Sequence, residues 1–338
     1  MASKSTNEED TSMWDEILAS ANRKNAFEKG TLILLGDGDC GKKTLIGALQ
    51  KTTARAIRDS GKGELVKLGE VGSKAAALDN SFLSVRDDPD GEEVTKLSVW
   101  MINEPENQHL LKTVIRPEGL ANTICCIALD LSKPWTIEES LPKWLEVLTS
   151  LIGEIKAKLP VEERDNLESK LKHYIRCYEE PEFDEHGRLR KKVQEGDEES
   201  AKSELPLGEN VLVSNLGVPV VVVCTKSEEI SQYDKSKDSE SSLVLFLQKH
   251  LRECCLTFGA SLIFTSVSKN INLDNFYEYL VHRLYDRPLR HKTQYHEHKK
   301  LFIPSGRDSM NLIRGFTKGS ESLQRYVRDP RYRKRKKQ

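Results

Sequence analysis

Hydrophobic positions in this chain form short uninterrupted runs, separated by longer segments in which they recur with a helical period. Uninterrupted runs are typical of strands that are buried on both faces of a parallel sheet. Four are predicted: Leu32 to Leu35, Thr123 to Leu129, Pro219 to Cys224 and Ser261 to Thr265. Two further runs, Ser81 to Val85 and Thr95 to Ile102, are joined by the turn-forming stretch DDPDGEE and predict a β-hairpin.

Segments with a period of about 3.6 residues lie between these runs and predict helices. One follows the first apolar run and ends at Gln50. The others span Leu110 to Ile115, Ile137 to Ile155, Val161 to Tyr178, Ser241 to Phe258 and Leu273 to Tyr285. Thr136 and Glu139 predict a capping box at the start of the third helix. Strands that alternate with helices imply a mostly parallel sheet with helices on both faces and a ligand crevice at the strands' carboxyl ends.

The first strand leads into the most informative stretch of the chain, LILLGDGDCGKKTLIGALQ. The segment from Gly36 to Lys42 fits the P-loop pattern G-x-x-x-x-G-K, with Gly38 and Gly41 inside it and a helix after it. Such a loop wraps a phosphate with backbone N–H groups at a helix N-terminus, which requires little side-chain bulk. The α/β class is therefore predicted to be a Ras-like P-loop GTPase fold.

Both positions that hold Mg²⁺ in a P-loop GTPase are altered in this chain. Lys43 stands where a Ser or Thr hydroxyl should coordinate the metal, and the nearest hydroxyl, Thr44, is turned by about 100° along the helix. At the end of the strand SVWMI, Asn103 replaces the expected Asp. We therefore predict no metal-binding and no catalytic residue.

A guanine-binding motif is only partly retained after the third apolar run. The stretch Thr225-Lys226-Ser227-Glu228 keeps the lysine of N-K-x-D and lengthens its carboxylate, and Ser266 stands in the loop that would flank the base. If a nucleotide binds, we expect it to be GDP or GTP without Mg²⁺, with the diphosphate favoured because Lys43 supplies the positive charge. The predicted nucleotide-binding residues are Gly36, Asp37, Gly38, Asp39, Cys40, Gly41, Lys42, Lys43, Thr44, Lys226, Glu228 and Ser266.

Composition limits the protein to one ordinary α/β domain with extensions. The 338 residues are 37% hydrophobic and 31% charged, with a net charge of −1, and no segment reaches the roughly 18 apolar residues of a membrane span. The N-terminus carries no secretion signal, and seven cysteines without C-x-x-C spacing indicate reduced core thiols in a cytosolic protein. The stretch HKTQYHEH, with His291, His296 and His298, is interpreted as a solvated linker and not as a metal site.

Composition also changes along the chain and predicts its organisation. Residues 1–29 are expected to be flexible apart from a short helix with an apolar face formed by Met13, Trp14, Ile17, Leu18 and Ala21. Residues 30–286 form the GTPase-like domain, interrupted by a flexible charged insertion at 179–207. Residues 287–316 are a C-terminal extension, and residues 317–338 are a basic flexible tail.

Several stretches together resemble the light intermediate chain family of cytoplasmic dynein, of the dynein-1 type, over about Met13 to Asp308. They are DLSKPW, SLPKW, PLGENVLVSNLGVPVVVVCTK, LTFGASLIFTSVSKNINLDNFYEYLVHRLY and KKLFIPSGRD. The resemblance implies a non-catalytic subunit with a Ras-like domain that binds the tail of the dynein heavy chain, alongside intermediate and light chains. It implies that the segments flanking this domain, the N-terminal helix and the extension of residues 287–316, pack on this partner. It also implies an indirect link to microtubules, a place in the cytoplasm and cytoskeleton, and cargo adaptors that the family recruits through a long C-terminal region, whereas this chain ends at Gln338.

The sequence therefore favours a pseudo-GTPase scaffold that helps link motor to cargo in minus-end transport. One alternative is an active GTP-hydrolysing switch with an unconventional metal site at Thr44, whose hydrolysis Lys42→Ala would abolish. A second alternative, a nucleic-acid-associated protein, depends on the basic run from Arg325 to Gln338 and would lose all RNA or DNA binding without it.

Overall fold

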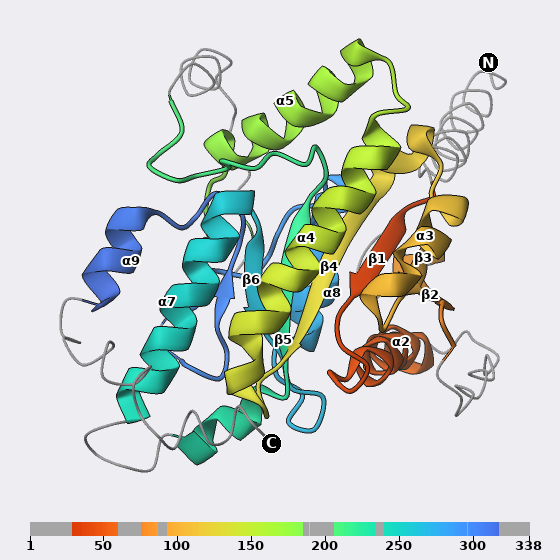
Figure 1. Ribbon diagram of the computed structural model, residues 1–338. Coiled ribbons are helices and arrows are strands. Elements are labelled where there is room, and N and C mark those ends of the chain that lie inside the picture. Colours follow the sequence, from red (N-terminus) through yellow and green to blue (C-terminus); the bar gives the residue numbers. More distant parts are fainter. Residues whose placement is uncertain are drawn as a thin grey trace, which may run out of the picture.

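A computed structural model describes residues 29–59, 76–86, 93–184, 189, 206–233, 240–295 and 297–317 (Figure 1). The predicted N-terminal helix, the basic tail and most of the charged insertion lie outside the described residues, as does His296. Among the described helices, none combines the length and the hydrophobicity that a bilayer crossing requires.

A seven-stranded sheet forms the centre of the molecule, in the order β2-β3-β1-β4-β5-β6-β7. Strands β3, β1, β4, β5 and β6 run parallel, while β2 and β7 at the two edges pair antiparallel with their neighbours. The bounds are β1 Thr31–Leu35, β2 Asp79–Arg86, β3 Glu93–Met101, β4 Thr123–Asp130, β5 Val220–Thr225, β6 Ser261–Phe264 and β7 Phe302–Ile303. The predicted hairpin, the four apolar strands and the mostly parallel sheet are confirmed.

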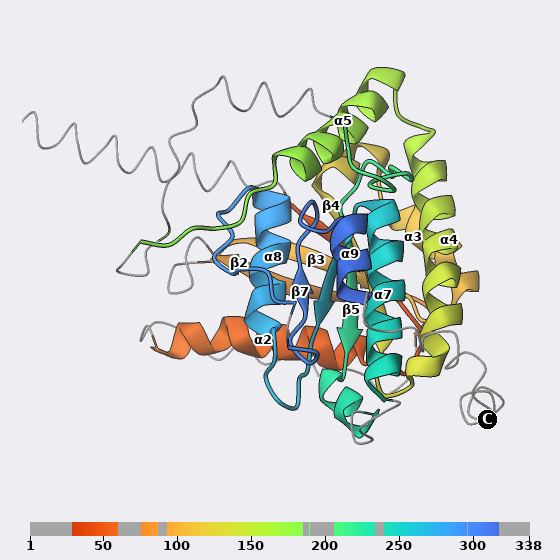
Figure 2. The ribbon, with the colours of Figure 1, turned by 90° about the vertical axis from the view of Figure 1, so that its left-hand side faces the viewer.

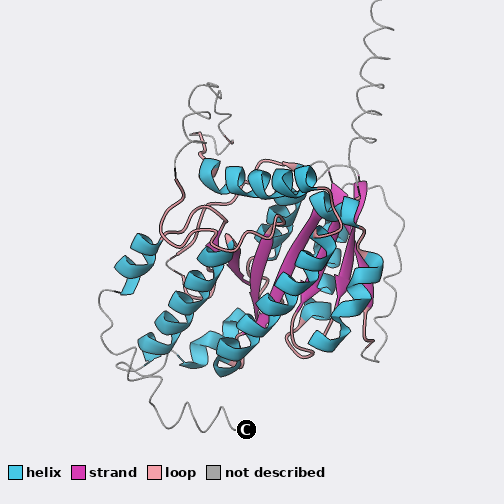
Figure 3. Ribbon diagram, turned by 45° about the horizontal axis from the view of Figure 1, so that its top comes forward, coloured by secondary structure: helices cyan, strands magenta, loops and turns pink. Residues whose placement is uncertain are grey.

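Helices cover both faces of this sheet, so the domain has three layers (Figure 2). Figure 3 shows the same strands enclosed by helices when the molecule is tilted forward. Side chains of α3, α4 and α7 pack on one face, those of α2 and α8 on the other, and α5 extends the first cluster. The bounds are α2 Lys42–Asp59, α3 Gln108–Val114, α4 Ile137–Lys156, α5 Val161–Cys177, α7 Glu240–Phe258, α8 Leu273–Tyr285 and α9 Met310–Thr317.

Strand β1 shows why an uninterrupted apolar run predicts a central strand. Ile33 and Leu35 face the cluster under α4, whereas Leu32 and Leu34 face the cluster under α2 and α8. All four side chains are fully buried. Since successive side chains of a strand point to opposite faces, a strand that is covered on both sides needs apolar residues at every position.

The start of α4 differs from the prediction. Thr136 was expected to cap the helix with its hydroxyl, together with Glu139, but that hydroxyl donates to the carbonyl of Lys133 at 2.8 Å and makes no cap bond. A single 3-10 turn over Pro134–Thr136 precedes the helix, which begins at Ile137. The capping box is therefore wrong, because the turn before the helix takes the hydroxyl that the cap would need.

The segment after α8 belongs to the same sheet. Leu301, Phe302 and Ile303 are buried, β7 pairs with β6, and Ile313 of α9 is fully buried where that helix packs on α7. The sequence placed the domain boundary at 286, whereas the structure continues the sheet beyond it. That this segment also packs on a partner stays a prediction.

A partly buried histidine joins three parts of this region. The ring of His282, in α8, contacts the backbone carbonyl of Arg287 through Nδ1 and the hydroxyl of Tyr174, in α5, through Nε2 at 2.9 Å. A carbonyl only accepts, so Nδ1 carries the hydrogen and Nε2 accepts from the tyrosine. Burial lowers the pKa of His282, assisted by the neighbouring Arg283, although the bond to Arg287 and the charge of Asp286 act against it. The histidine of the folded protein is therefore neutral at pH 7.

This burial predicts a loss of stability on acidification. The unfolded state binds a proton near the ordinary histidine pKa of about 6.5, and the folded state binds it only at lower pH. The contribution of His282 is therefore complete above pH 6.5 and declines as the pH falls towards the folded pKa. Urea unfolding at about pH 7.5 and pH 5.5 should show this decline. The variant His282→Gln, which has no titrating ring, should have a shallower slope; an equal slope would contradict the assignment.

Candidate functional site

The P-loop lies at the carboxyl end of β1, between this strand and α2. Gly36 has a φ of +148°, and a Cβ built on it would lie 2.5 Å from the carbonyl oxygen of Ala128 in β4. Gly41, with a φ of +86°, immediately precedes the helix. Glycine is needed at Gly36 because any side chain would collide with the neighbouring strand. The loop therefore has the tight strand-to-helix turn on which phosphate cradles are built.

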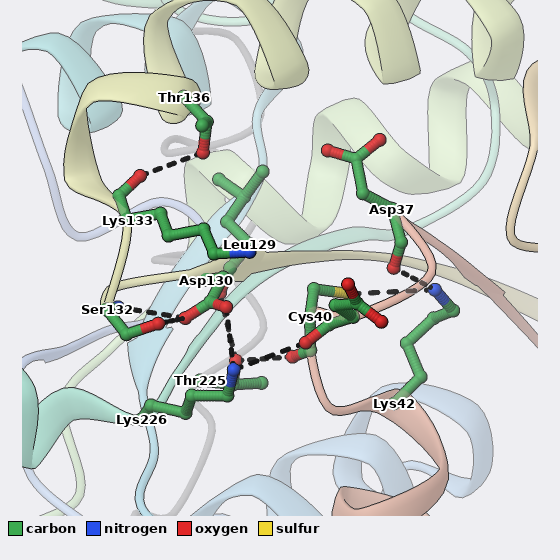
Figure 4. Close-up of polar contacts among 11 residues, drawn as sticks. Asp37, Cys40, Lys42, Leu129, Asp130, Ser132, Lys133, Thr136, Thr225 and Lys226 are labelled. Carbon is green, nitrogen blue, oxygen red and sulfur yellow. Dashed lines mark hydrogen bonds and ion pairs between the residues drawn. The ribbon is translucent and has the colours of Figure 1, made fainter. Parts of the chain in front are cut away.

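Lys42 is folded back onto this loop. Its Nζ donates to the carbonyl oxygens of Gly36 at 2.5 Å and Asp37 at 2.7 Å, and its side chain lies 3.5 Å from Cys40 Sγ (Figure 4). Burial lowers the pKa of Lys42, although Cys40 and Asp37 act in the opposite direction, and burial raises the pKa of the Cys40 thiol. A phosphate that entered the loop would therefore replace uncharged carbonyl oxygens as the acceptor for the Lys42 ammonium group, and its hydrogen bond would be charge-assisted.

The carboxylate of Asp37 points away from Lys42 and is held by α4. Ser140 Oγ donates to it at 2.6 Å, Lys143 Nζ at 2.8 Å and Trp144 Nε1 at 3.1 Å. Partial burial acts to raise the pKa of Asp37, but the bonds from Lys143, Ser140 and Trp144 outweigh it and keep the pKa below its ordinary value. The negative charge of Asp37 is therefore neutralised by α4 and does not oppose an anion in the loop.

The residues at the two magnesium positions do not fit the metal. Lys43 Nζ forms an ion pair with Asp79, at the start of β2, with an N–O distance of 3.0 Å. Thr44 is exposed on the next position of the helix, and Asn103 follows β3 with an amide in place of a carboxylate. The ammonium group of Lys43, which lies beside the Asp79 carboxylate, occupies this edge of the sheet. Hard divalent cations require oxygen ligands, so a cationic side chain here does not suit Mg²⁺.

The end of β5 is fastened to the P-loop. Thr225 Oγ1 donates to the carbonyl oxygens of Cys40 at 2.5 Å and Leu129 at 3.1 Å. Lys226, which has a φ of +56°, donates from Nζ to Asp130 Oδ2 at 2.7 Å and to the carbonyl of Asp39 at 3.2 Å. The retained lysine of the partial guanine motif thus contacts the P-loop, as Figure 4 shows.

The second half of the partial motif lies against the loop after β6. Ser268 Oγ donates to Glu228, and hydrogen bonds from Ser266 and Ser268 lower the pKa of Glu228 against the raising effect of its burial. Glu228 is therefore a carboxylate at neutral pH and could accept hydrogen bonds from the N–H groups of a guanine ring. Ser266 itself is fully buried.

The structure brings the predicted residues together at one edge of the sheet. P-loop residues 36–44 follow β1, Lys226 and Glu228 follow β5, and Ser266 follows β6. Since these strands are parallel, their carboxyl ends meet at the same edge. Among the described residues, no group of three or more His, Cys, Asp or Glu side chains is arranged to hold a metal ion.

Sequence reasoning missed the groups that hold these residues in place. Asp130 accepts from Ser132 N at 2.8 Å and from Ser132 Oγ at 2.6 Å besides Lys226, so it fixes both a turn and the lysine. The spacing Asp-x-Ser after a strand is typical of such a turn and was a usable signal. The partners of Asp37 and Lys43 lie far away in the sequence, and no local pattern indicates them.

Comparison with known proteins identifies the family. The family profile described as dynein light intermediate chain (DLIC) matches residues 8–324. Cytoplasmic dynein 1 light intermediate chain 1 of Rattus norvegicus is 33% identical over 311 residues, which cover 90% of this chain and 56% of the rat protein. The protein of the same name from Homo sapiens is 33% identical over 318 residues, covering 92% of this chain and 57% of the human one.

The chain thus spans little more than half the length of these relatives. Among solved structures, the crystal structure of the dynein light intermediate chain's conserved domain is similar, with a TM-score of 0.63 at 22% identity over 88% of each chain. This similarity agrees with the α/β fold described above. The resemblance found in the sequence is confirmed: the chain belongs to the dynein light intermediate chain family.

Proposed function

We propose that this chain is an accessory subunit of cytoplasmic dynein, a non-catalytic GTPase-like scaffold that binds the tail of the heavy chain. In this role it works with the intermediate and light chains and helps link the motor to cargo and adaptors for minus-end transport along microtubules in the cytoplasm. The observation that carries the proposal is the family match over residues 8–324, which includes all of the described residues.

The site supports a scaffold and not a hydrolytic switch. Lys43 is paired with Asp79 at one magnesium position, and Asn103 stands at the other. A lysine and an asparagine thus replace the hydroxyl and the carboxylate that hold the metal at the γ-phosphate in a working GTPase. The rival function, an active GTPase with Thr44 as an unconventional metal ligand, predicts phosphate release from GTP by the purified chain.

Nucleotide binding is a second proposed property, carried by the geometry of the P-loop. The loop keeps its Gly36 turn, Lys42 is directed into it, and Lys226 and Glu228 follow β5 at the same edge of the sheet, which supports a role for them at the base. We propose that the site binds GDP, or more weakly GTP, without Mg²⁺, with Lys42 as the cation that meets the phosphates, because Lys43 is already paired with Asp79.

Helix α9 offers a surface for the heavy chain. Leu312 is 44% exposed there, whereas its neighbour Ile313 is buried against the domain. We propose that the free side of this helix packs on the heavy-chain tail, as the sequence predicted for residues 287–316.

Affinity capture of the tagged chain from cells is expected to recover the very large motor subunit. Leu312→Glu should reduce this recovery several-fold, because it places a charge in the proposed contact, while the matched control Asn311→Glu, at an exposed position beside it, should not. If the unaltered chain does not recover the motor subunit, the proposal that this chain is a dynein subunit is refuted. Equal recovery with both variants would refute only the α9 contact.

A further inference from the structure

The central sheet has two edges, and their backbones are covered in different ways. At β7 the chain itself lies alongside: Gln294 N donates to the carbonyl of Phe302 at 2.9 Å, and Phe302 N donates to the carbonyl of Gln294 at 3.0 Å. At β2, on the other edge, β3 is the one described strand that pairs with it (Figure 1). The outward backbone groups of an edge strand are a template on which another strand can add.

The register of the sheet shows which backbone groups of β2 face outward. Ser98 of β3 donates its N–H to the carbonyl just before β1, so the even-numbered residues of β3 are directed towards β1. The odd-numbered residues of β3 are therefore directed towards β2, where they lie opposite odd-numbered residues, as Leu97 does opposite Leu83. The even-numbered residues of β2, which include Phe82 and Ser84, consequently present their N–H and C=O groups to the open side of the strand.

Side chains from α2 and α8 occupy two of these outward carbonyls. Gln50 of α2 donates from Nε2 to the carbonyl of Phe82 at 2.9 Å and to Ser81 Oγ at 2.8 Å. Tyr277 of α8 donates from its hydroxyl to the carbonyl of Ser84 at 2.8 Å. Two of the bonds that an added strand would make are therefore already made within the chain.

The hydroxyl of Tyr277 acts on this edge as both donor and acceptor. Burial raises the pKa of Tyr277 to about 12, and a hydrogen bond from the backbone of Arg86 acts against this rise. A phenol can donate one hydrogen bond and accept another. Tyr277 therefore satisfies a carbonyl and an amide near the end of β2, the two kinds of group that the backbone of a neighbouring strand would satisfy.

The sequence of β2 offers little other protection against strand addition. Residues 80–85 include no charged side chain, and Phe82 at their centre is 54% exposed. An antiparallel pair of two β2 strands centred on Phe82 would place the two phenyl rings opposite each other and Asn80 opposite Ser84. Since no like charges would meet within these residues, β2 could pair with its own copy without repulsion.

We propose that Gln50 and Tyr277 protect the open edge of β2 and keep it from pairing with β2 of a second copy of this chain. A second copy would have to displace both side chains and break their bonds to the outward carbonyls before its own backbone could bond there. This protection requires neither a nucleotide nor a dynein partner.

Sedimentation velocity of the full chain over a range of concentrations tests the proposal. The double variant Gln50→Ala, Tyr277→Phe removes both polar groups and keeps the ring at 277. We expect the association constant for dimer formation to rise about tenfold, because each lost hydrogen bond no longer opposes pairing. The matched control Tyr295→Phe removes a hydroxyl that donates to the carbonyl of Arg307, away from β2, and should leave association unchanged.

A third substitution and amide exchange locate the contact. Phe82→Lys, added to the double variant, would place two like charges opposite each other in the pair, so association should return to that of the unaltered chain. In the double variant, amides of residues 79–86 should exchange more slowly as the protein concentration rises, and those of residues 123–130 at an unchanged rate. Gln50→Ala alone, which alters a partly exposed side chain, should show part of the rise in association.

Two results would overturn the proposal. The first is equal association of the unaltered chain, of Gln50→Ala and of the double variant, which would mean that the two side chains do not oppose pairing. The second is association of the double variant without protection of residues 79–86, or association that Phe82→Lys leaves unchanged, which would place the contact on another surface.

Discussion

Replacing Asp308 by alanine is expected to lower the free energy of unfolding by about 3–5 kcal/mol. Asp308 accepts two hydrogen bonds of 2.7 Å from Arg252 of α7, one from Nε and one from Nη2. The side chains are only 10% and 3% exposed. Removal of the carboxylate would leave a guanidinium charge in the protein interior without its main counter-ion, which costs far more than the loss of a surface pair.

Denaturant unfolding of matched variants distinguishes this effect from a general loss of packing. The double variant Arg252→Met, Asp308→Leu removes both charges and should lose less stability than Asp308→Ala alone. Glu209→Ala breaks a pair of similar bidentate geometry with Arg314, but both of its side chains are about half exposed, so its effect should be much smaller. A loss below about 1 kcal/mol for Asp308→Ala would contradict the burial of an uncompensated charge.

The pair matters because it fastens the segment after α8 to the rest of the domain. Arg307 donates to Glu180 at 3.1 Å, and the same carboxylate accepts the backbone N–H of Thr293 at 2.6 Å. Gly306, with a φ of +88°, packs so closely on α5 that a Cβ would lie 2.6 Å from the carbonyl oxygen of Ile175. These contacts hold residues 287–309 against the rest of the domain, while Leu312 on the outer side of α9 is 44% exposed.

The sequence was sufficient to predict the central strands of the sheet. An apolar run such as residues 123–129 is readable because both faces of its strand are buried, so every position must be apolar. The hairpin was predictable because turn-forming residues separate two short strands. The P-loop was predictable because its tight turn requires glycine where a side chain would collide with the neighbouring strand.

Strand β7 was not predictable in the same way. It has two residues, Phe302 and Ile303, and its partner β6 lies about 40 residues earlier in the chain. A two-residue strand has no periodicity of its own, and its existence depends on tertiary packing between α7 and α8. The domain boundary at 286 followed from the last strong helical pattern and stopped before this strand.

The candidate site was predictable in its composition but not in its internal bonds. The glycines, Lys42 and Lys226 were identified from local motifs. The ion pair of Lys226 with Asp130 spans 96 residues and the bond from Trp144 to Asp37 spans 107, and a single sequence carries no signal for pairs at such separation. The same long-range bonds decide which charges in the site are neutralised.

The substitution Lys42→Ala is expected to weaken GDP binding about 10- to 150-fold. The Nζ group of Lys42 lies inside the loop, 2.5 Å from the carbonyl of Gly36, and the side chain is 2% exposed. A charge-assisted hydrogen bond to a phosphate contributes about 1.5–3 kcal/mol, and each 1.4 kcal/mol is a factor of ten in affinity. Titration with fluorescently labelled GDP measures the change. Lys96→Ala, which removes an equal charge from an exposed position on β3, should leave the affinity unchanged.

Magnesium separates this mode of binding from that of a working GTPase. Because the Lys43 ammonium group is paired with Asp79 where the metal would need oxygen ligands, the affinity for GDP should be the same in excess Mg²⁺ and in EDTA. Tighter binding in Mg²⁺, or phosphate release from GTP that Lys42→Ala abolishes, would favour the GTPase switch. Absence of binding of either nucleotide would instead leave the P-loop as a structural turn, in which Lys42 serves as the permanent partner of the loop carbonyls.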